Sequence, residues 1–76
     1  MIERVIQIIS ETGGIEPLAP DSQIYEAGFS SLRALELLLS LEKEFGIELP
    51  DKDFIAARTP AEIAGLIERL QQNQAA

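Results

Sequence analysis

The 76-residue chain is predicted to form an all-α domain, a small four-helix bundle of three longer helices and one short helix. Apolar residues recur with the spacing of one helix face in the segments numbered 2–12, 31–45 and 60–71. The extended run over residues 47–50 is too short for a sheet and has no partner strand. Five glycines and four prolines suit short loops between helices. A chain of this length has room for one domain, numbered 1–76.

The first helix is expected over residues 2–12. Its apolar stripe has the i, i+3, i+4, i+7 spacing of a helix that buries one face, and it consists of Ile2, Val5, Ile6 and Ile9. A loop over residues 13–30 follows, beginning with two glycines. Isolated apolar residues are expected to hold this loop on the core: Ile15, Leu18, Ile24 and Tyr25. A connection this long is uncommon in so small a domain, and it leads directly to a pair of serines.

The second helix is expected over residues 31–45, with Ser30 as its N-cap and Gly46 as its C-terminal stop. Its predicted core face consists of Ala34, Leu37, Leu38, Leu41 and Phe45. A second apolar arc, roughly 90° or more from the centre of the first, consists of Leu32, Leu35 and Leu39. Two interpretations of this arc remain open: a wide core face on a helix between two neighbours, or an exposed apolar patch for partners.

A short helix over residues 51–57 is expected after the extended run. Asp51 is its expected N-cap, because an aspartate oxygen can accept a hydrogen bond from an amide of the first turn. Phe54 and Ile55 supply its apolar side chains.

The last helix is expected over residues 60–71. Thr59 and Glu62 have the spacing of a capping box, and Pro60 occupies the first helical position between them. The buried stripe of this helix consists of Ile63, Leu66, Ile67 and Leu70. From Gln71 onward the helix is expected to fray.

Composition argues against catalysis by this chain alone. Cysteine and histidine are absent, so the chain can form no disulfide, thiolate nucleophile, Cys/His zinc site or Ser-His-Asp triad. A small hydrolase would need Lys43 or Lys52 to activate a serine, and no recognisable motif positions either lysine. We therefore expect a non-catalytic protein without catalytic residues and without a metal site.

Charge and hydropathy limit the partners. The formal net charge is −7, from thirteen acids against six bases, which argues against nucleic acids and membrane surfaces as partners. Basic protein surfaces and simple solubility explain the acidity equally well. Glu3 and Arg4 interrupt the apolar N-terminal run, so it lacks the continuous apolar stretch of a signal peptide, and no segment approaches membrane-spanning length. A cytoplasmic monomer is expected.

The two serines stand at the predicted start of the second helix, in the run Gly28-Phe29-Ser30-Ser31-Leu32. Four N–H groups at a helix start lack partners within the helix, and the macrodipole places about half a positive charge there. A phosphodiester on a serine at this position would gain about 0.3–1 kcal/mol from that site. Ser30 suits capping, and Ser31 is the candidate for modification. The alternative is that both serines are caps.

This serine run and the residues after it resemble the acyl and peptidyl carrier proteins. The resemblance extends over residues 2–70 and rests on Gly28, Ser31, Leu32, Leu37, Leu41, Glu42, Glu44 and the run Phe45-Gly46-Ile47-Glu48-Leu49-Pro50-Asp51. It implies a helical carrier in which a phosphopantetheinyl transferase attaches phosphopantetheine from coenzyme A to Ser31. The arm would carry acyl or aminoacyl groups as thioesters. The resemblance also implies a ligase that loads the group and transferases or synthases that use it.

The resemblance further implies a partner surface on the second and third helices: Leu32, Arg33, Leu35, Glu36, Leu39, Lys43, Phe54 and Ile55. Many fatty-acid carriers have aspartate where Ser30 stands, and their second helix is nearly uniformly acidic, whereas Arg33 and Lys43 interrupt the acids here. Such reversals can reject a partner of the wrong charge, so a freestanding carrier of a specialised biosynthetic pathway is expected. The alternative is an unmodified helical interaction module that binds partners through Leu32, Leu35 and Leu39.

Overall fold

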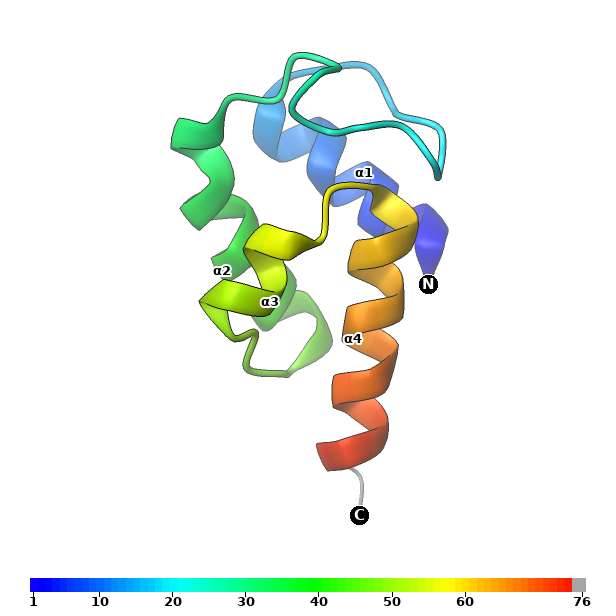
Figure 1. Cartoon of the computed structure of the whole chain (residues 1–76), viewed down its shortest axis with the longest axis vertical. Coiled ribbons are helices and arrows are strands. Elements are labelled where there is room, and N and C mark those ends of the chain that lie inside the picture. Colours follow the sequence, from blue (N-terminus) through cyan, green and yellow to red (C-terminus); the bar gives the residue numbers. More distant parts are fainter. Residues whose placement is uncertain (75–76) are drawn as a thin grey trace.

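The computed structural model describes residues 1–74, and over that range it contains helices and no strand (Figure 1). In chain order the elements are α1 (Ile2–Gly13), a 3₁₀ turn η1 (Ser31–Arg33), α2 (Ala34–Phe45), α3 (Asp51–Ala56) and α4 (Pro60–Gln74). The predicted fold class, a small bundle of three longer helices and one short helix, is confirmed. No helix within residues 1–74 is long and apolar enough to cross a lipid bilayer.

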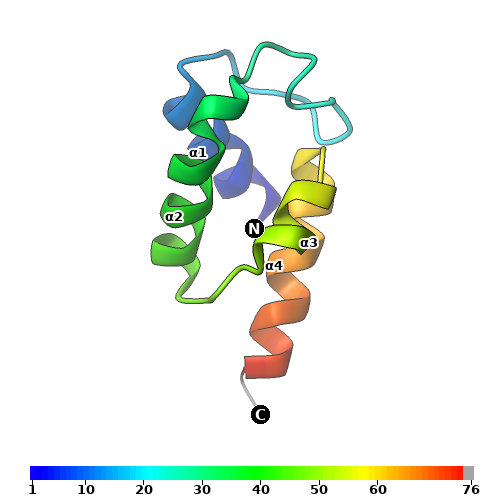
Figure 2. The same cartoon turned by 60° about the vertical axis from the view of Figure 1, so that its left-hand side comes forward.

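One core lies between the helices. Helix α1 packs against both α2 and α4, and α3 packs on α4. Figure 2 shows α2 and α4 on opposite sides of the molecule, with the loop over residues 14–30 crossing one end of the bundle. The core residues from the helices are Val5, Ile8, Ile9, Leu37, Leu38, Leu41, Phe54, Ile63, Ala64, Leu66 and Ile67, and the connecting segments add Ile24, Phe29, Ile47, Leu49 and Ala57.

The buried face of α1 is shifted from the predicted stripe toward Ile8. Val5 and Ile9 are fully buried as predicted, and Ile2 packs against the core. Ile6 is only partly buried and does not belong to the core, whereas Ile8, which lies outside the predicted stripe, is buried. The orientation of α1 follows from its packing against both α2 and α4, which the sequence pattern of one helix does not record. In α2 the predicted core face is confirmed at Leu37, Leu38 and Leu41, while Ala34 and Phe45 are half-buried against it.

Two helix starts differ from the prediction. The second helix begins with a 3₁₀ turn over Ser31–Arg33 and becomes α-helical only at Ala34. The short helix has Pro50 at its N-cap position, with no side-chain hydrogen bond, so Asp51 is its first residue rather than its cap.

The last helix differs from the prediction at both ends. Thr59 Oγ1 accepts from the Glu62 N–H at 3.1 Å, as in a capping box, but Glu62 Oε1 accepts from the Arg58 N–H at 2.8 Å. In a regular capping box the glutamate side chain would accept from the N–H of Thr59, so this second bond is displaced here by one residue toward the N-terminus. The helix continues through Gln74 instead of fraying from Gln71, and residues 75–76 of the predicted frayed segment lie outside the described residues.

Backbone hydrogen bonds attach the long loop to the α3–α4 connection. The Ile24 N–H donates to the Arg58 carbonyl at 2.9 Å, and the Ala61 N–H donates to the Pro20 carbonyl at 2.9 Å. The Ile24 side chain is 1% exposed, so this part of the loop belongs to the core. The bonds fix the middle of the loop, and only a short stretch separates Ile24 from the serines.

Candidate functional site

The serine turn follows an aromatic anchor. The Phe29 ring is buried against Gly13 at the end of α1, and it meets the Tyr25 ring edge to face with centroids 6.1 Å apart. Its N–H donates to the Ile24 carbonyl at 3.2 Å. The preceding residue, Gly28, has φ +105°, a conformation that strongly favours glycine. The chain therefore enters the turn from a fixed point in the core.

The two serines have different environments. Ser30 Oγ accepts from the Leu32 N–H at 3.2 Å, which confirms Ser30 as the side-chain cap. Ser31 is exposed, and its hydroxyl makes no hydrogen bond within the described residues. The interpretation of both serines as caps therefore fails for Ser31. Its hydroxyl is accessible to an incoming enzyme without the loss of any internal contact.

Fewer amides of this turn are free to bind a phosphate than the four at the start of a regular α-helix. The Leu32 N–H is taken by Ser30 Oγ, the Arg33 N–H by the Ser30 carbonyl at 2.9 Å, and the Ala34 N–H by the Ser31 carbonyl. The Ser31 N–H is the one amide of the turn without a partner among the described residues. A phosphate on Ser31 would thus meet one free amide and the dipole of the following helix.

An exposed apolar surface follows the serine turn along α2. Leu32, Leu35 and Leu39, which we call the leucine face, are 90%, 64% and 55% exposed. Of the two interpretations of this arc, the exposed patch is therefore correct and the wide core arc is wrong. Ile55 of α3 is also exposed, at 61%, and it lines the same hollow as Leu35.

Phe54 differs from the other residues of the predicted partner surface. Its ring is 3% exposed and belongs to the core. It nevertheless lines an apolar hollow of about 190 Å³ between α2 and α3, together with Ala34, Leu35, Leu38, Asp51 and Ile55. Phe54 therefore packs beneath the surface that Leu35 and Ile55 present, and it is not itself an exposed contact.

The acids at the C-terminal end of α2 bind other parts of the chain. Glu44 accepts two hydrogen bonds from Arg4 of α1, at 3.0 and 2.9 Å, which lower the pKa of Glu44 below its usual range and raise the pKa of Arg4. Glu42 Oε2 accepts from the Leu49 N–H at 2.8 Å and so fixes the loop after α2. Helical periodicity indicates neither contact, because Arg4 lies in another helix from Glu44 and Leu49 lies in the loop after the helix that contains Glu42.

The remaining charges near the leucine face are exposed. Arg33 Nη1 lies 3.5 Å from Glu36 Oε2 and donates to the Thr12 carbonyl at 3.4 Å, so it bridges the turn, α2 and the end of α1. Lys43 is exposed and forms no ion pair within the described residues. The site thus combines a free hydroxyl, an apolar face and few uncompensated charges.

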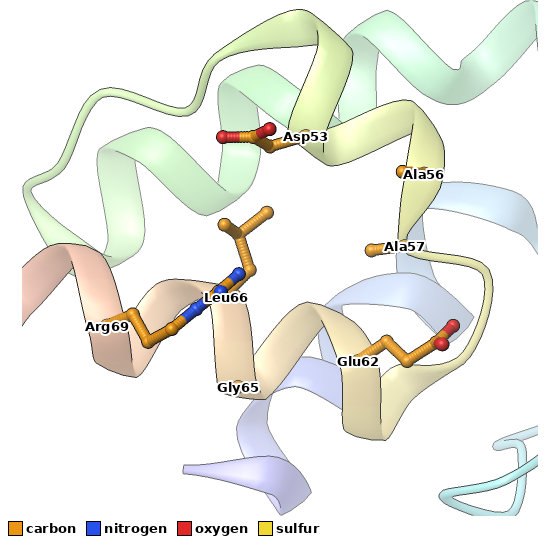
Figure 3. A pocket seen from close by; sticks show the side chains of 7 residues that line it. All are labelled: Asp53, Ala56, Ala57, Glu62, Gly65, Leu66 and Arg69. Carbon is orange, nitrogen blue, oxygen red and sulfur yellow. The ribbon is translucent and has the colours of Figure 1, made fainter.

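A second hollow, of about 550 Å³, lies between α3 and α4 (Figure 3). Asp53, Ala56 and Ala57 line it from α3 and the residue after it, and Gly65, Leu66 and Arg69 line it from α4. Glu62 also lines it and is already bonded to the Arg58 amide. No lining residue comes from α2 or the serine turn, so this hollow is separate from the site around Ser31.

Comparison with known proteins agrees with this geometry. Residues 3–67 match the family model described as the phosphopantetheine attachment site. The chain is 32% identical over 69 residues to the acyl carrier protein of Rickettsia bellii, covering 87% of this chain and 80% of that protein. It is 29% identical over 75 residues to the meromycolate extension acyl carrier proteins of Mycobacterium tuberculosis and Mycolicibacterium smegmatis. That alignment covers 95% of this chain, 65% of the first protein and 76% of the second.

Proposed function

This chain belongs to the acyl carrier protein family, whose covalent group is phosphopantetheine, and we propose that it holds acyl or aminoacyl intermediates on an arm attached to Ser31. The observation that carries the residue assignment is the division between the serines: Ser30 Oγ is bound in the cap, whereas the Ser31 hydroxyl is exposed and unbonded among the described residues. When attached, phosphopantetheine supplies the thiol that a chain without cysteine lacks, and the intermediate is held there as a thioester.

Attachment requires only an acceptor hydroxyl from this chain. One bond forms between Ser31 Oγ and a phosphorus atom of coenzyme A, and the bond from that phosphorus to the nucleotide part breaks. The hydroxyl proton leaves to a base of the transferase, because this chain has no histidine to accept it. The chain contributes the fixed position of the turn, through Phe29 and Ser30, and the free Ser31 amide beside the new phosphodiester.

The residues expected for partner contact are those next to the attachment site. The leucine face and Ile55 provide apolar contact area within reach of an enzyme bound at Ser31, and Arg33, Glu36 and Lys43 provide charge. The proposed partners are a phosphopantetheinyl transferase, a loading ligase, and transferases or synthases that use the loaded group.

A specialised biosynthetic pathway is the proposed setting. The relatives from mycobacteria are named for meromycolate extension, a task narrower than that of a general acyl carrier. The mixed charge on α2 also suits partners other than enzymes built for a uniformly acidic helix. The carried group is proposed to be an amino acid or an unusual acyl unit.

Intact-mass measurement tests the attachment site. The wild-type chain is incubated with coenzyme A and a broad-specificity transferase, and we expect a mass increase of one phosphopantetheine. Ser31→Ala should abolish the increase while circular dichroism stays helical, and Ser30→Ala should retain it. Addition that persists in Ser31→Ala would disprove the assignment. Absence of addition to the wild type with several transferases would favour the unmodified interaction module.

A further inference from the structure

The serine turn is held at both of its ends by side chains that contact the same end of α1. Before the turn, the buried Phe29 ring packs on Gly13. After it, Arg33 Nη1 donates to the Thr12 carbonyl at 3.4 Å. Thr12 and Gly13 are the last two residues of α1, next to the start of α2 (Figure 2). Ser31 therefore lies on a short segment that is attached at two points to one helix end.

The end of α1 is a favourable place for a cation. The carbonyls in the last turn of a helix lack intrahelical partners, and the macrodipole places about half a negative charge there. Helix α1 has no base in its own last turn, which contains the acid Glu11. No backbone N–H donates to the Thr12 carbonyl in the described part of the chain. Arg33, which comes from η1, thus supplies the positive charge that this helix end lacks.

A second contact keeps Arg33 in this position. Glu36 Oε2 lies 3.5 Å from the same Nη1 atom, one helical turn further along the chain. The guanidinium therefore joins a carboxylate of α2 to a carbonyl of α1. Both side chains are more than half exposed, so these contacts contribute little to the stability of the whole bundle. What they restrain is the turn, because Arg33 is its last residue.

We propose that Arg33 is a positioning residue for attachment at Ser31, because its contact with the Thr12 carbonyl restrains the turn that presents the hydroxyl. This inference rests on the carrier function proposed above, and it gives Arg33 a role within the chain in addition to the charge that it offers a partner. Without this side chain, Phe29 and the Ser30 cap alone hold the turn. The turn is then open in a larger fraction of molecules, and a transferase finds the hydroxyl in place less often.

Arg33→Gln tests the proposal, with Arg69→Gln as the matched control. Both variants remove one positive charge, and Arg69 is exposed on α4 beside the separate α3–α4 hollow (Figure 3). The first measurement is amide hydrogen exchange of the unmodified chain by NMR. The N–H groups of Leu32, Arg33 and Ala34 close the turn and report its opening. The amide of Leu41, at a fully buried position of α2, reports unfolding of the whole bundle.

In Arg33→Gln we expect exchange at the turn amides to be about twofold to fivefold faster than in the wild type, with exchange at Leu41 unchanged. Arg69→Gln should behave as the wild type at all of these amides. Unchanged exchange at the turn would overturn the inference. An equal increase at Leu41 would also overturn it, because Arg33 would then stabilise the whole bundle.

The second measurement is the kcat/KM for modification of Ser31, followed by mass spectrometry. A positioning effect belongs to the free chain, so Arg33→Gln should lower kcat/KM by the same factor for two transferases whose docking surfaces differ in charge, while Arg69→Gln leaves it unchanged. A loss found with one enzyme only would assign Arg33 to direct contact and overturn the inference. If several transferases fail to modify the wild type, the carrier function is rejected, and the exchange measurement still decides whether Arg33 restrains the turn.

Discussion

Replacement of Gly13 by alanine tests whether the end of α1 holds the serine turn in place. A Cβ atom on Gly13 would lie 2.5 Å from Cδ2 and 2.8 Å from Cε2 of Phe29. The Phe29 side chain is 2% exposed, so its ring cannot move aside without disturbing the core. Overpacking of this kind costs about 1–3 kcal/mol, and the higher helix propensity of alanine returns up to about 1 kcal/mol. We expect a net loss of about 1–2 kcal/mol in the free energy of unfolding.

Gly65→Ala is the matched control. Gly65 is exposed in α4, and a Cβ atom there would meet nothing within 4 Å. Only the propensity change acts, so we expect a gain of about 0.5–1 kcal/mol. Urea unfolding followed by circular dichroism measures both variants. In thermal unfolding, a change of 1 kcal/mol corresponds to a shift of about 4–8 °C in Tm for a domain of this size.

The second measurement is modification of Ser31. Displacement of Phe29 moves the start of the turn, so Gly13→Ala should lower the kcat/KM of a transferase while Gly65→Ala leaves it unchanged. The double variant Gly13→Ala, Phe29→Leu should recover part of the lost stability, because the smaller side chain relieves the clash. A Gly13→Ala variant as stable as the wild type would refute the packing argument. A destabilised variant modified at the wild-type rate would refute the link from this contact to the turn.

Three further predictions concern the cap, the ion pair and the leucines. Ser30→Ala removes the bond to the Leu32 amide and should lower the free energy of unfolding by about 1 kcal/mol in urea titrations, with attachment retained. Glu44→Gln should destabilise the chain near pH 7. Because Arg4 lowers the folded-state pKa of Glu44, the difference from wild type is fully present above the unfolded-state pKa and disappears as pH falls through the folded-state pKa, as unfolding curves at several pH values would show. Leu41→Ala, at a fully buried position, should cost about 2–5 kcal/mol, whereas Leu39→Ala at an exposed one should cost under about 1 kcal/mol and slow the transferase.

Helix existence was predictable because the apolar periodicity is local, whereas helix starts depend on contacts that periodicity does not record. The hydroxyl of Ser30 reaches the amide two residues ahead, and its carbonyl accepts from Arg33, which closes a 3₁₀ turn before the α-helix begins. Asp51 is a residue type that often caps helices. Pro50, however, has the extended conformation of an N-cap residue, with φ −62° and ψ 132°, so α3 already begins at Asp51. Both differences are confined to the first turn of a helix.

The candidate site was predictable in part for the same reason. The assignment of Ser31, which stays a prediction, follows from the sequence because a serine at a helix start is a local pattern and the family resemblance distinguishes Ser31 from Ser30. The contact of Gly13 with Phe29 and the engagement of Glu42 and Glu44 were not, because each joins segments brought together only by the fold. Because Arg4 of α1 pairs with Glu44, the net charge around α2 is less negative than the sequence of α2 alone gives.

The distribution of charge opposes self-association of a chain that exposes leucines. Residues 1–30 contain five acids and one base, and residues 46–76 contain five acids and three bases, so most of the net charge lies away from the leucine face. Two copies approaching through their leucine faces must bring these acidic regions together, and repulsion opposes that contact. A protein without this acidity meets less repulsion at the same face and can still bury the leucines. An apolar surface near Ser31 thus need not favour self-association.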